Sequence, residues 1–354
     1  MNILYGVPGE GMGHATRSKV VIDHLLEKGH EVCIVSSSRA FSFLDRSFPG
    51  KAIEIKGFHF AYKNAEVSKT ATFLSNLKAA GKNLVYNTGK KHLVEKKFMP
   101  DVVISDFESF SFFFAKEHRL PLISIDNMQV MDRCILDIKI SREEKNNYRL
   151  ARAIVQAKVP GCNQYLISSF FDAAIKKKNT SLVPPIVRQI IQDAKVTKGK
   201  HIVMYQTSSS LKTVKEVLQQ LPNETFYVYG MNMDLTDGNV VFKPFSEAGF
   251  IKDLASCKAV IANGGFSFIS EAVYLKKAVY SFPITNQFEQ WMNAAYIDKL
   301  GYGRHFESLS ADHLKAFLYD LPLFEKKLSA YEQNGNDVLF NALDDLLKRI
   351  TPNT

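Results

Sequence analysis

Residues 260–271, which read VIANGGFSFISE, combine residue types that together suit the binding of a charged ligand. The apolar run predicts a strand over residues 259–262, Gly264 and Gly265 predict a turn, and a helix is expected to begin near Ser267. A helix N-terminus offers N–H groups and about half a positive charge, so it binds phosphate well. Because glycine has no Cβ, the two glycines would let a phosphate approach the backbone closely.

Glu271 lies about one turn into this predicted helix. A carboxylate there would repel a phosphate group, but it could accept hydrogen bonds from ribose hydroxyl groups beside it. Phosphate at the turn and ribose at Glu271 together indicate a nucleotide site. The competing interpretation is that the glycine turn serves packing alone and that Glu271 only complements the helix dipole.

A second glycine-rich loop, PGEGMGH at residues 8–14, follows the first predicted strand at residues 3–7. It resembles the dinucleotide-binding pattern G-x-G-x-x-G, but His14 stands where the third glycine would be. The acidic residue expected after the second strand, residues 31–36, is also absent, because the chain continues there with Ser37, Ser38 and Arg39. NAD or FAD binding is therefore not expected.

His14 is instead a candidate general base. It would lie at the N-terminus of a helix and at the carboxyl edge of a parallel sheet, where open α/β proteins bind ligands. The positive end of the helix dipole disfavours the imidazolium form, so His14 should be able to accept a proton. Asp106 follows a predicted strand at residues 101–105 and could orient His14, and Glu108 is a second candidate for that role. A turn histidine and a helix-capping aspartate without chemistry are the alternatives.

Short apolar strands alternate with amphipathic helices along the chain, which predicts an α/β protein with mainly parallel sheets covered by helices on both faces. The strands predicted are residues 3–7, 31–36, 101–105, 122–125, 165–168, 201–205, 226–229, 240–242, 259–262 and 278–282. Lysines and prolines between residues 176 and 200 interrupt this alternation and predict a connection between two domains. The domains predicted are an N-terminal domain (1–180), a linker (181–200), a second α/β domain (201–325) and a C-terminal helix (326–354).

Composition narrows the class of protein. The 354 residues carry a formal net charge of +9, which favours acidic partners such as nucleotides, phospholipid surfaces or nucleic acid. Four cysteines without metal-ligand or C-x-x-C spacing indicate a reducing, cytoplasmic compartment. We see no signal peptide and no apolar run near the ~20 residues of a membrane-spanning helix.

Two α/β domains, a glycine loop ending in His14 and the later Gly-Gly segment together resemble the GT-B glycosyltransferases. The nearest patterns are those of the bacterial transferase that adds N-acetylglucosamine to lipid I and of UDP-glucuronosyltransferase-like enzymes. The start of the chain also resembles a poorly characterised prokaryotic branch of glycosyltransferases. The resemblance is specific at residues 6–18 and 260–303, and many relatives have histidine where this chain has Asn263. The later residues that carry it are Asn263, Gly264, Gly265, Ser267, Glu271, Pro283, Glu289, Gln290, Asn293 and residues 301–303.

The resemblance implies a hexosyltransferase-like activity and two facing Rossmann-like domains with a cleft between them. Residues 1–180 would be the acceptor-side domain, residues 201–325 the nucleotide-sugar-binding domain, and the helix at 326–354 would cross back to the first domain. The donor would be a nucleotide sugar, UDP-linked, acting as co-substrate on the C-terminal domain, and the acceptor hydroxyl would lie near His14 and Asp106. Such enzymes generally need no bound metal, and no D-x-D motif is present, so neither metal nor cofactor is expected. The donor residues implied are Gln206, Thr207, Ser208, Phe245, Ser246, Asn263, Gly264, Gly265, Phe266, Ser267, Glu271, Glu289 and Gln290, and the acceptor-side loop residues are Gly11, Gly13 and Arg17.

Two other functions remain open from the sequence. A UDP-sugar 2-epimerase could use the same fold, although such epimerases usually place Asp-Ser before the Gly-Gly turn where this chain has Ala262 and Asn263. A non-enzymatic basic module could bind nucleic acid or a membrane surface, but no motif that reads nucleic acid is present. A lipid-linked or cell-envelope acceptor would favour peripheral association with the inner face of the membrane. The residues that suggest such a surface are Lys90, Lys91, Lys96, Lys97, Phe107, Phe110, Phe112, Phe113 and Phe114.

Overall fold

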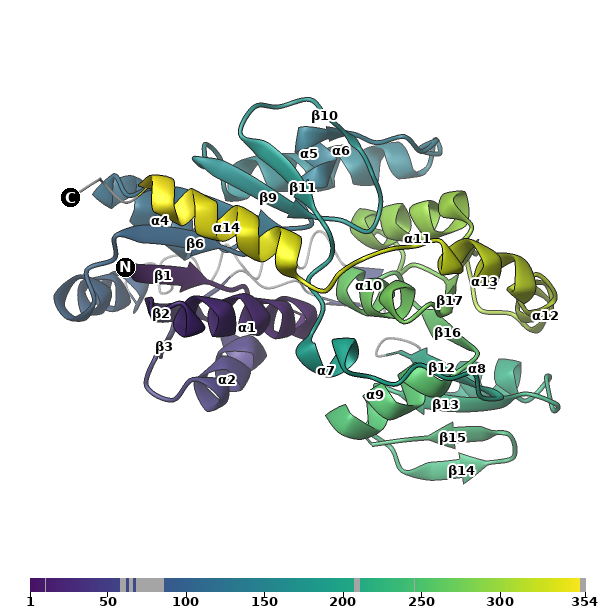
Figure 1. The fold of residues 1–354 in the computed structure, drawn as a ribbon. Coiled ribbons are helices and arrows are strands. Elements are labelled where there is room, and N and C mark those ends of the chain that lie inside the picture. Colours follow the sequence, from purple (N-terminus) through teal and green to yellow (C-terminus); the bar gives the residue numbers. More distant parts are fainter. Residues whose placement is uncertain are drawn as a thin grey trace. The chain divides into compact units, whose positions relative to one another are not determined.

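The computed structural model describes residues 1–9, 11–57, 62–63, 66–67, 86–206, 211–244 and 246–350. The chain forms two compact units, each built on its own parallel sheet (Figure 1). The first unit comprises Met1–Lys63, Val67–Ile186 and Asn334–Thr354, and the second comprises Asn64–Glu66 and Val187–Gln333.

The first unit contains a seven-stranded sheet in the order β11-β9-β7-β6-β1-β2-β3, in which every neighbouring pair is parallel. The central strands are buried, as expected for a parallel sheet that helices cover on both faces. The strands of this unit are β1 (Asn2–Gly6), β2 (Glu31–Ser36), β3 (Ala52–Glu54), β4 (Tyr62–Lys63), β5 (Glu66–Val67), β6 (Val102–Ser105), β7 (Leu122–Asp126), β8 (Cys134–Ile135), β9 (Gln164–Ser168), β10 (Ala174–Ile175) and β11 (Thr180–Val183).

The C-terminal helix completes the first unit. Leu339, Leu343 and Leu347 recur every four residues and join the hydrophobic core that contains β1 and helix α1. His24 of α1 also pairs with Asp344, with 2.8 Å between Nε2 and Oδ1. The helices of this unit are α1 (Met12–Glu27), α2 (Ser38–Ser47), a helix over residues 86–97, α4 (Ser109–His118), α5 (Val130–Arg133), α6 (Glu144–Lys158) and α14 (Asp337–Ile350).

The second unit also has a seven-stranded sheet, in the order β14-β15-β13-β12-β16-β17-β18, which is parallel except at β14. Its strands are β12 (His201–Tyr205), β13 (Thr225–Tyr229), β14 (Leu235–Asp237), β15 (Val240–Phe242), β16 (Ala259–Ala262), β17 (Ala278–Ser281) and β18 (Gly303–His305). Its helices are α7 (Gln189–Gln192), α8 (Leu211–Leu218), α9 (Glu247–Ser256), α10 (Phe266–Tyr274), α11 (Phe288–Leu300), α12 (Ala311–Tyr319) and α13 (Leu321–Ser329).

The predicted boundaries need correction at both ends of the second domain. Residues 180–183 were assigned to the end of the first domain and the linker, but they form β11 and pair with β9. The first unit continues to Ile186 and the second begins at Val187, so most of the predicted linker belongs to the second unit. At the other end, the predicted single tail helix is divided, because α13 belongs to the second unit and only α14 belongs to the first.

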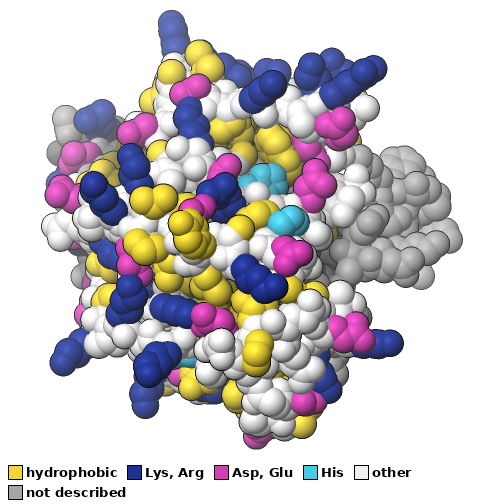
Figure 2. Space-filling model, turned by 90° about the vertical axis from the view of Figure 1, so that its right-hand side faces the viewer, with side chains coloured by type: hydrophobic (Ala, Val, Ile, Leu, Met, Phe, Trp, Pro, Cys, Tyr) yellow, Lys and Arg dark blue, Asp and Glu magenta, His cyan; other side chains and the backbone are white. Residues whose placement is uncertain are grey.

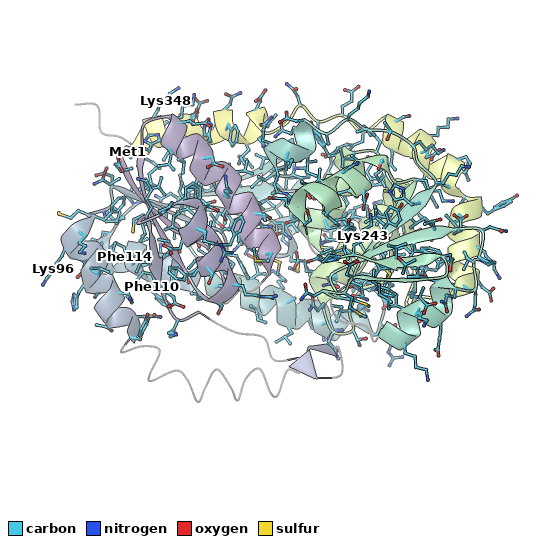
Figure 3. The ribbon with its side chains drawn as sticks, turned by 90° about the horizontal axis from the view of Figure 1, so that it is seen from below. Met1, Lys96, Phe110, Phe114, Lys243 and Lys348 are labelled. Carbon is cyan, nitrogen blue, oxygen red and sulfur yellow. The ribbon has the colours of Figure 1, made fainter. Side chains whose placement is uncertain are left out.

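The aromatic segment after β6 is mainly core. Phe107, Phe112 and Phe114 are at most 8% exposed, and only Phe113, at 64%, is largely exposed. Figure 3 shows Phe110 and Phe114 beside the sheet of the first unit, with their ring centroids 6.4 Å apart. The buried rings of Phe107, Phe112 and Phe114 are therefore not available to lipid, because the apolar side of α4 packs on the strands.

Basic side chains do not form one continuous patch on the face shown in Figure 2, where they are interspersed with acidic and apolar groups. Lys91, one of the four lysines considered for a basic surface, forms an ion pair with Glu117. In the part of the chain that the structure describes, no helix is both long and apolar enough to cross a membrane.

Candidate functional site

The structure brings His14 and Asp106 into contact. Strands β1 and β6 are neighbours in the first sheet, so the loops at their carboxyl ends meet at one edge. Gly11 has φ 81°, a left-handed conformation that suits glycine, and α1 begins at the next residue. His14 Nδ1 then lies 3.0 Å from Asp106 Oδ1, and the histidine side chain is 19% exposed while the aspartate is 1% exposed.

Arg17 lies beneath this pair. Its Nε donates to Asp106 Oδ2 at 2.9 Å and its Nη2 donates to Oδ1 at 2.5 Å. Its Nη1 donates to Asn127 Oδ1 at 2.6 Å, and the residue is only 3% exposed. The sequence predicted that Arg17 belongs to the acceptor-side loop. In the structure Arg17 lies in α1, three residues after His14, and its buried side chain binds Asp106.

This network fixes the charge of Asp106. Burial alone would raise the pKa of the Asp106 carboxyl, but the Arg17 guanidinium and His14 outweigh it and hold the pKa well below its usual range. Arg17 Nη2 also lies 2.7 Å from His14 Nδ1. A guanidinium only donates, so this contact fits the tautomer in which Nδ1 accepts, whereas the contact with Asp106 fits the tautomer in which Nδ1 donates. In the second tautomer Nε2 keeps a lone pair that can accept a proton, as a general base needs.

Glu108 has a different role from the one considered for it. Its carboxylate accepts from the backbone N–H groups of Phe110 at 2.8 Å and Ser111 at 2.7 Å, and so caps the start of α4. Burial raises the pKa of Glu108 despite these bonds. Phe107, between the two acidic residues, has φ 58°, a left-handed conformation that is costly for an aromatic residue. Asp106 therefore reaches His14 while Glu108 holds the helix.

The Gly-Gly turn follows β16 and leads into α10. Gly264 has φ 100°, and a Cβ at this position would lie 2.6 Å from the carbonyl oxygen of Gln290, so only glycine fits. Asn293 Nδ2 donates to the Gly264 carbonyl at 2.9 Å, and Asn263 Nδ2 donates to the Phe282 carbonyl at 3.1 Å. These bonds hold the turn in place. Gly265 is exposed and is the N-cap of α10, which starts at Phe266.

Other predicted donor residues lie in the same unit but not all at its surface. Gln290 Oε1 accepts from the backbone N–H of Ile284 at 3.0 Å, and Glu289 lies in the first turn of α11. Ser246 caps α9 through a bond from Gly249 N at 3.3 Å. Gln206 is 0% exposed, which does not fit the predicted direct contact with a ligand. Thr207, Ser208 and Phe245 lie outside the described residues.

Glu271 is 6% exposed and already has a partner that the sequence analysis missed. Arg188 donates to both of its oxygens, from Nε to Oε1 at 2.6 Å and from Nη2 to Oε2 at 2.7 Å. Arg188 is 83 residues earlier in the chain than Glu271 and belongs to the predicted linker. No sequence pattern there indicated a functional residue.

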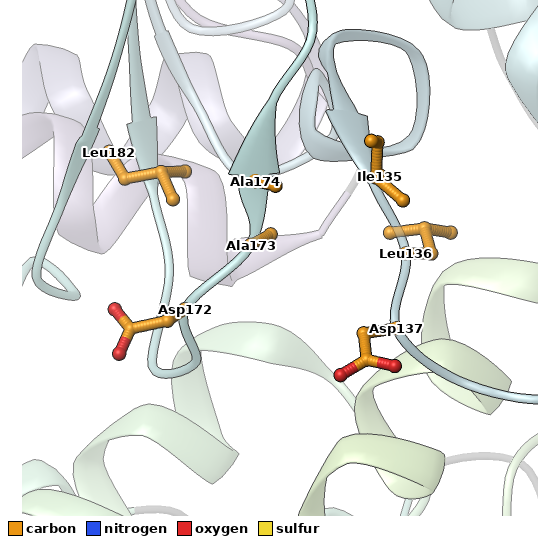
Figure 4. A pocket seen from close by; sticks show the side chains of 7 residues that line it. All are labelled: Ile135, Leu136, Asp137, Asp172, Ala173, Ala174 and Leu182. Atoms are coloured by element: carbon orange, nitrogen blue, oxygen red, sulfur yellow. The ribbon is translucent and has the colours of Figure 1, made fainter.

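A pocket lies in the first unit beside the small β8–β10 sheet (Figure 4). Its volume is about 450 Å³. β8 follows β7 along the chain and β10 follows β9, so the pocket belongs to the same carboxyl side of the sheet as His14. Asp137 and Asp172 contribute carboxylates to an otherwise apolar lining of Ile135, Leu136, Ala173, Ala174 and Leu182. Among the described residues, no group of three or more His, Cys, Asp or Glu side chains is placed to hold a metal.

Residues 1–322 match the family model described as Glycosyl transferase family 1. An uncharacterized glycosyltransferase of Methanosarcina acetivorans is 24% identical over 330 residues, which cover 86% of this chain and 85% of the relative.

Solved glycosyltransferases share the fold. LpCGTa in complex with UDP superimposes with a TM-score of 0.69 at 15% identity and 99% coverage of both chains. The spinosyn rhamnosyltransferase SpnG complexed with thymidine diphosphate gives a TM-score of 0.64 at 14% identity, covering 98% of this chain and 100% of the other. At these identities the similarity establishes the fold, which is GT-B, with two Rossmann-like units.

Proposed function

The chain belongs to glycosyl transferase family 1 and is a glycosyltransferase, and we propose that it transfers a sugar from a UDP-sugar to an acceptor hydroxyl without a bound metal. The family excludes the non-enzymatic binding module considered above and favours transfer over epimerisation. The observation that carries the donor half of the proposal is the Gly264–Gly265 turn at the start of α10, where Gly265 is exposed, with the buried carboxylate of Glu271 in the same helix.

The donor would bind to the second unit through its nucleotide. The diphosphate would lie against the turn, where the N-terminus of α10 supplies backbone N–H groups and a positive dipole end. The ribose hydroxyls would donate to Glu271, and Glu289 and Gln290 would contact the sugar. That one structural neighbour was solved with UDP and another with thymidine diphosphate supports a pyrimidine nucleoside diphosphate.

The chemistry would be carried by His14. As the acceptor oxygen bonds to the anomeric carbon, the bond from that carbon to the β-phosphate oxygen breaks and UDP leaves with the electron pair. The acceptor proton passes to His14 Nε2, and the Asp106 carboxylate, ionised at neutral pH, stabilises the imidazolium that forms. The charge that develops on UDP is stabilised by the start of α10.

For the acceptor, we propose the pocket of Figure 4 as a binding surface. Its apolar residues would cover the body of the acceptor, and the carboxylates of Asp137 and Asp172 would accept hydrogen bonds from hydroxyl groups. A lipid-linked or cell-envelope glycan on the cytoplasmic side fits this description. The buried aromatic segment after β6 removes the aromatic part of the argument for a membrane surface.

UDP should raise the thermal unfolding temperature of the protein, because a ligand that binds only the native state stabilises it. At a UDP concentration ~100 times the dissociation constant the gain is about 2.7 kcal/mol. We would compare UDP, dTDP, GDP and ADP by thermal shift at equal concentrations. A response to ADP or GDP in place of UDP would overturn the proposed donor, and no response to any of the four would overturn the nucleotide site.

Transfer should survive EDTA, because the N-terminus of α10 takes over the charge stabilisation that a divalent cation would otherwise provide. The measurement is UDP release from a UDP-sugar in the presence of an acceptor, with and without the chelator. Complete loss of release that Mg²⁺ or Mn²⁺ restores would contradict the proposal.

A further inference from the structure

The Glu271 carboxylate is held by a fork of two hydrogen bonds from a single guanidinium. Both oxygens accept from Arg188, at 2.6 Å and 2.7 Å, in the bidentate geometry that fixes a carboxylate in position as well as in charge. The two side chains are 7% and 15% exposed. A carboxylate so deeply buried is costly without such a partner.

The guanidinium is itself held from a second side. Arg188 Nη1 donates to Glu247 Oε1 at 2.7 Å, and the Glu247 side chain is 50% exposed. Burial alone would lower the pKa of Arg188, but its bonds to Glu271 and Glu247 raise it, so the side chain is a permanent cation. Arg188 immediately precedes the short helix α7, and its side chain makes no capping hydrogen bond to that helix.

The bonds from Arg188 leave acceptor capacity on Glu271 for a ligand. An ionised carboxylate has about four lone-pair positions, and the fork from Arg188 occupies two of them. The other two match the two hydroxyl groups of a ribose. A ribose could therefore bind Glu271 while Arg188 stays in place.

We propose that Arg188 is a positioning residue of the donor site, which holds the Glu271 carboxylate in place and aimed at the ribose without contacting the nucleotide itself. This inference rests on the proposed function, in which Glu271 binds the ribose. The alternative is that Arg188 leaves Glu271 when a donor arrives and contacts the diphosphate, because a guanidinium also suits phosphate.

The two roles differ in which part of the nucleotide they affect. We would measure the binding of UDP by calorimetry and of uridine by ligand-observed NMR to Arg188→Ala, Arg188→Lys and the unchanged protein. A positioning role predicts that Arg188→Ala weakens UDP and uridine alike, each roughly fivefold, or about 1 kcal/mol. It also predicts that the donor KM rises while kcat stays nearly constant. Arg188→Lys, which keeps the charge but not the fork, should recover part of the affinity.

Glu325→Gln is the matched control. It removes one carboxylate charge from the second unit, where Glu325 pairs with the exposed Lys198, and leaves both partners of Arg188 intact. UDP binding should be unchanged in this variant. In the double variant Arg188→Ala with Glu271→Ala, removal of Arg188 should add nothing to the loss from Glu271→Ala, because Arg188 acts only through that carboxylate.

Each contrary result points to a definite alternative. A loss for UDP without a loss for uridine would show that Arg188 contacts the diphosphate, and would overturn the positioning role. Unchanged UDP binding in Arg188→Ala, with binding lost in Glu271→Ala, would overturn this inference and leave the donor site standing. Unchanged binding in Glu271→Ala would overturn the donor site itself. If Arg188→Ala does not fold, the Arg188→Lys comparison with UDP and uridine decides between the same outcomes.

Discussion

Replacing Glu271 with alanine is expected to raise the dissociation constant of free UDP about thirtyfold, which corresponds to a net loss of about 2 kcal/mol. A carboxylate that accepts from ribose hydroxyl groups makes charge-assisted hydrogen bonds worth ~1.5–3 kcal/mol each, before the cost of taking the hydroxyls from water. The loss should fall on the donor KM more than on kcat, because the ribose is held alike before and during transfer. Calorimetry with UDP and donor-saturation kinetics measure the two effects.

The structure adds a control that this experiment needs. Glu271→Ala removes one of the two acidic partners of Arg188, and only Glu247 then remains to balance its charge. The fold of this variant must therefore be checked by circular dichroism and thermal unfolding. Glu271→Gln keeps the shape of the side chain and one acceptor oxygen, so its loss of affinity should be smaller. With 2′-deoxy-UDP the unchanged protein should bind more weakly than with UDP, and Glu271→Ala should barely distinguish the two. A folded Glu271→Ala that binds UDP as tightly as the unchanged protein would refute the nucleotide site.

The sequence predicted the central strands of the two sheets better than the edge strands. Buried parallel strands are continuous apolar runs, and β2, β12, β15 and β16 have the predicted bounds. The strands that were missed in the two large sheets are β3, β11, β14 and β18, which are the four edge strands. An edge strand is short and partly exposed, so it carries polar residues and glycine where a central strand is apolar. Periodicity alone therefore does not detect it.

The site divides in a similar way between local and distant features. Gly264 and Gly11 could be recognised because a turn that demands a positive φ leaves a local trace in the sequence. That His14 meets Asp106 depends on β1 and β6 being neighbours, which the rule of ligand binding at the carboxyl edge made a reasonable hypothesis.

The two arginines of the site could not be assigned in the same way. Arg17 and Arg188 each hold a buried carboxylate, at separations of 89 and 83 residues. Arginine is abundant on surfaces, and nothing local distinguishes one that turns inward. Sequence analysis thus located both carboxylates, but it predicted an acceptor-side role for Arg17 and did not identify Arg188.

Replacing His14 with alanine is expected to lower kcat by at least ~tenfold, and by up to the 10²–10⁴-fold that general bases contribute. The affinity for UDP should stay within a few-fold of the unchanged protein, because His14 lies in the first unit and the proposed nucleotide site in the second. Asp106 keeps its partner Arg17 in this variant, so the buried charge stays compensated and the fold should persist.

The measurement is UDP release from a saturating UDP-sugar in the presence of an acceptor, together with UDP calorimetry on the same preparation. His92→Ala is the matched control, because His92 is a 60% exposed histidine that pairs only locally with Glu95, and its removal should leave kcat unchanged. An unchanged kcat in His14→Ala would show that His14 has a purely structural role at the start of α1. A folded His14→Ala that instead loses UDP affinity would place His14 at the donor, and the acceptor proton would then need another base.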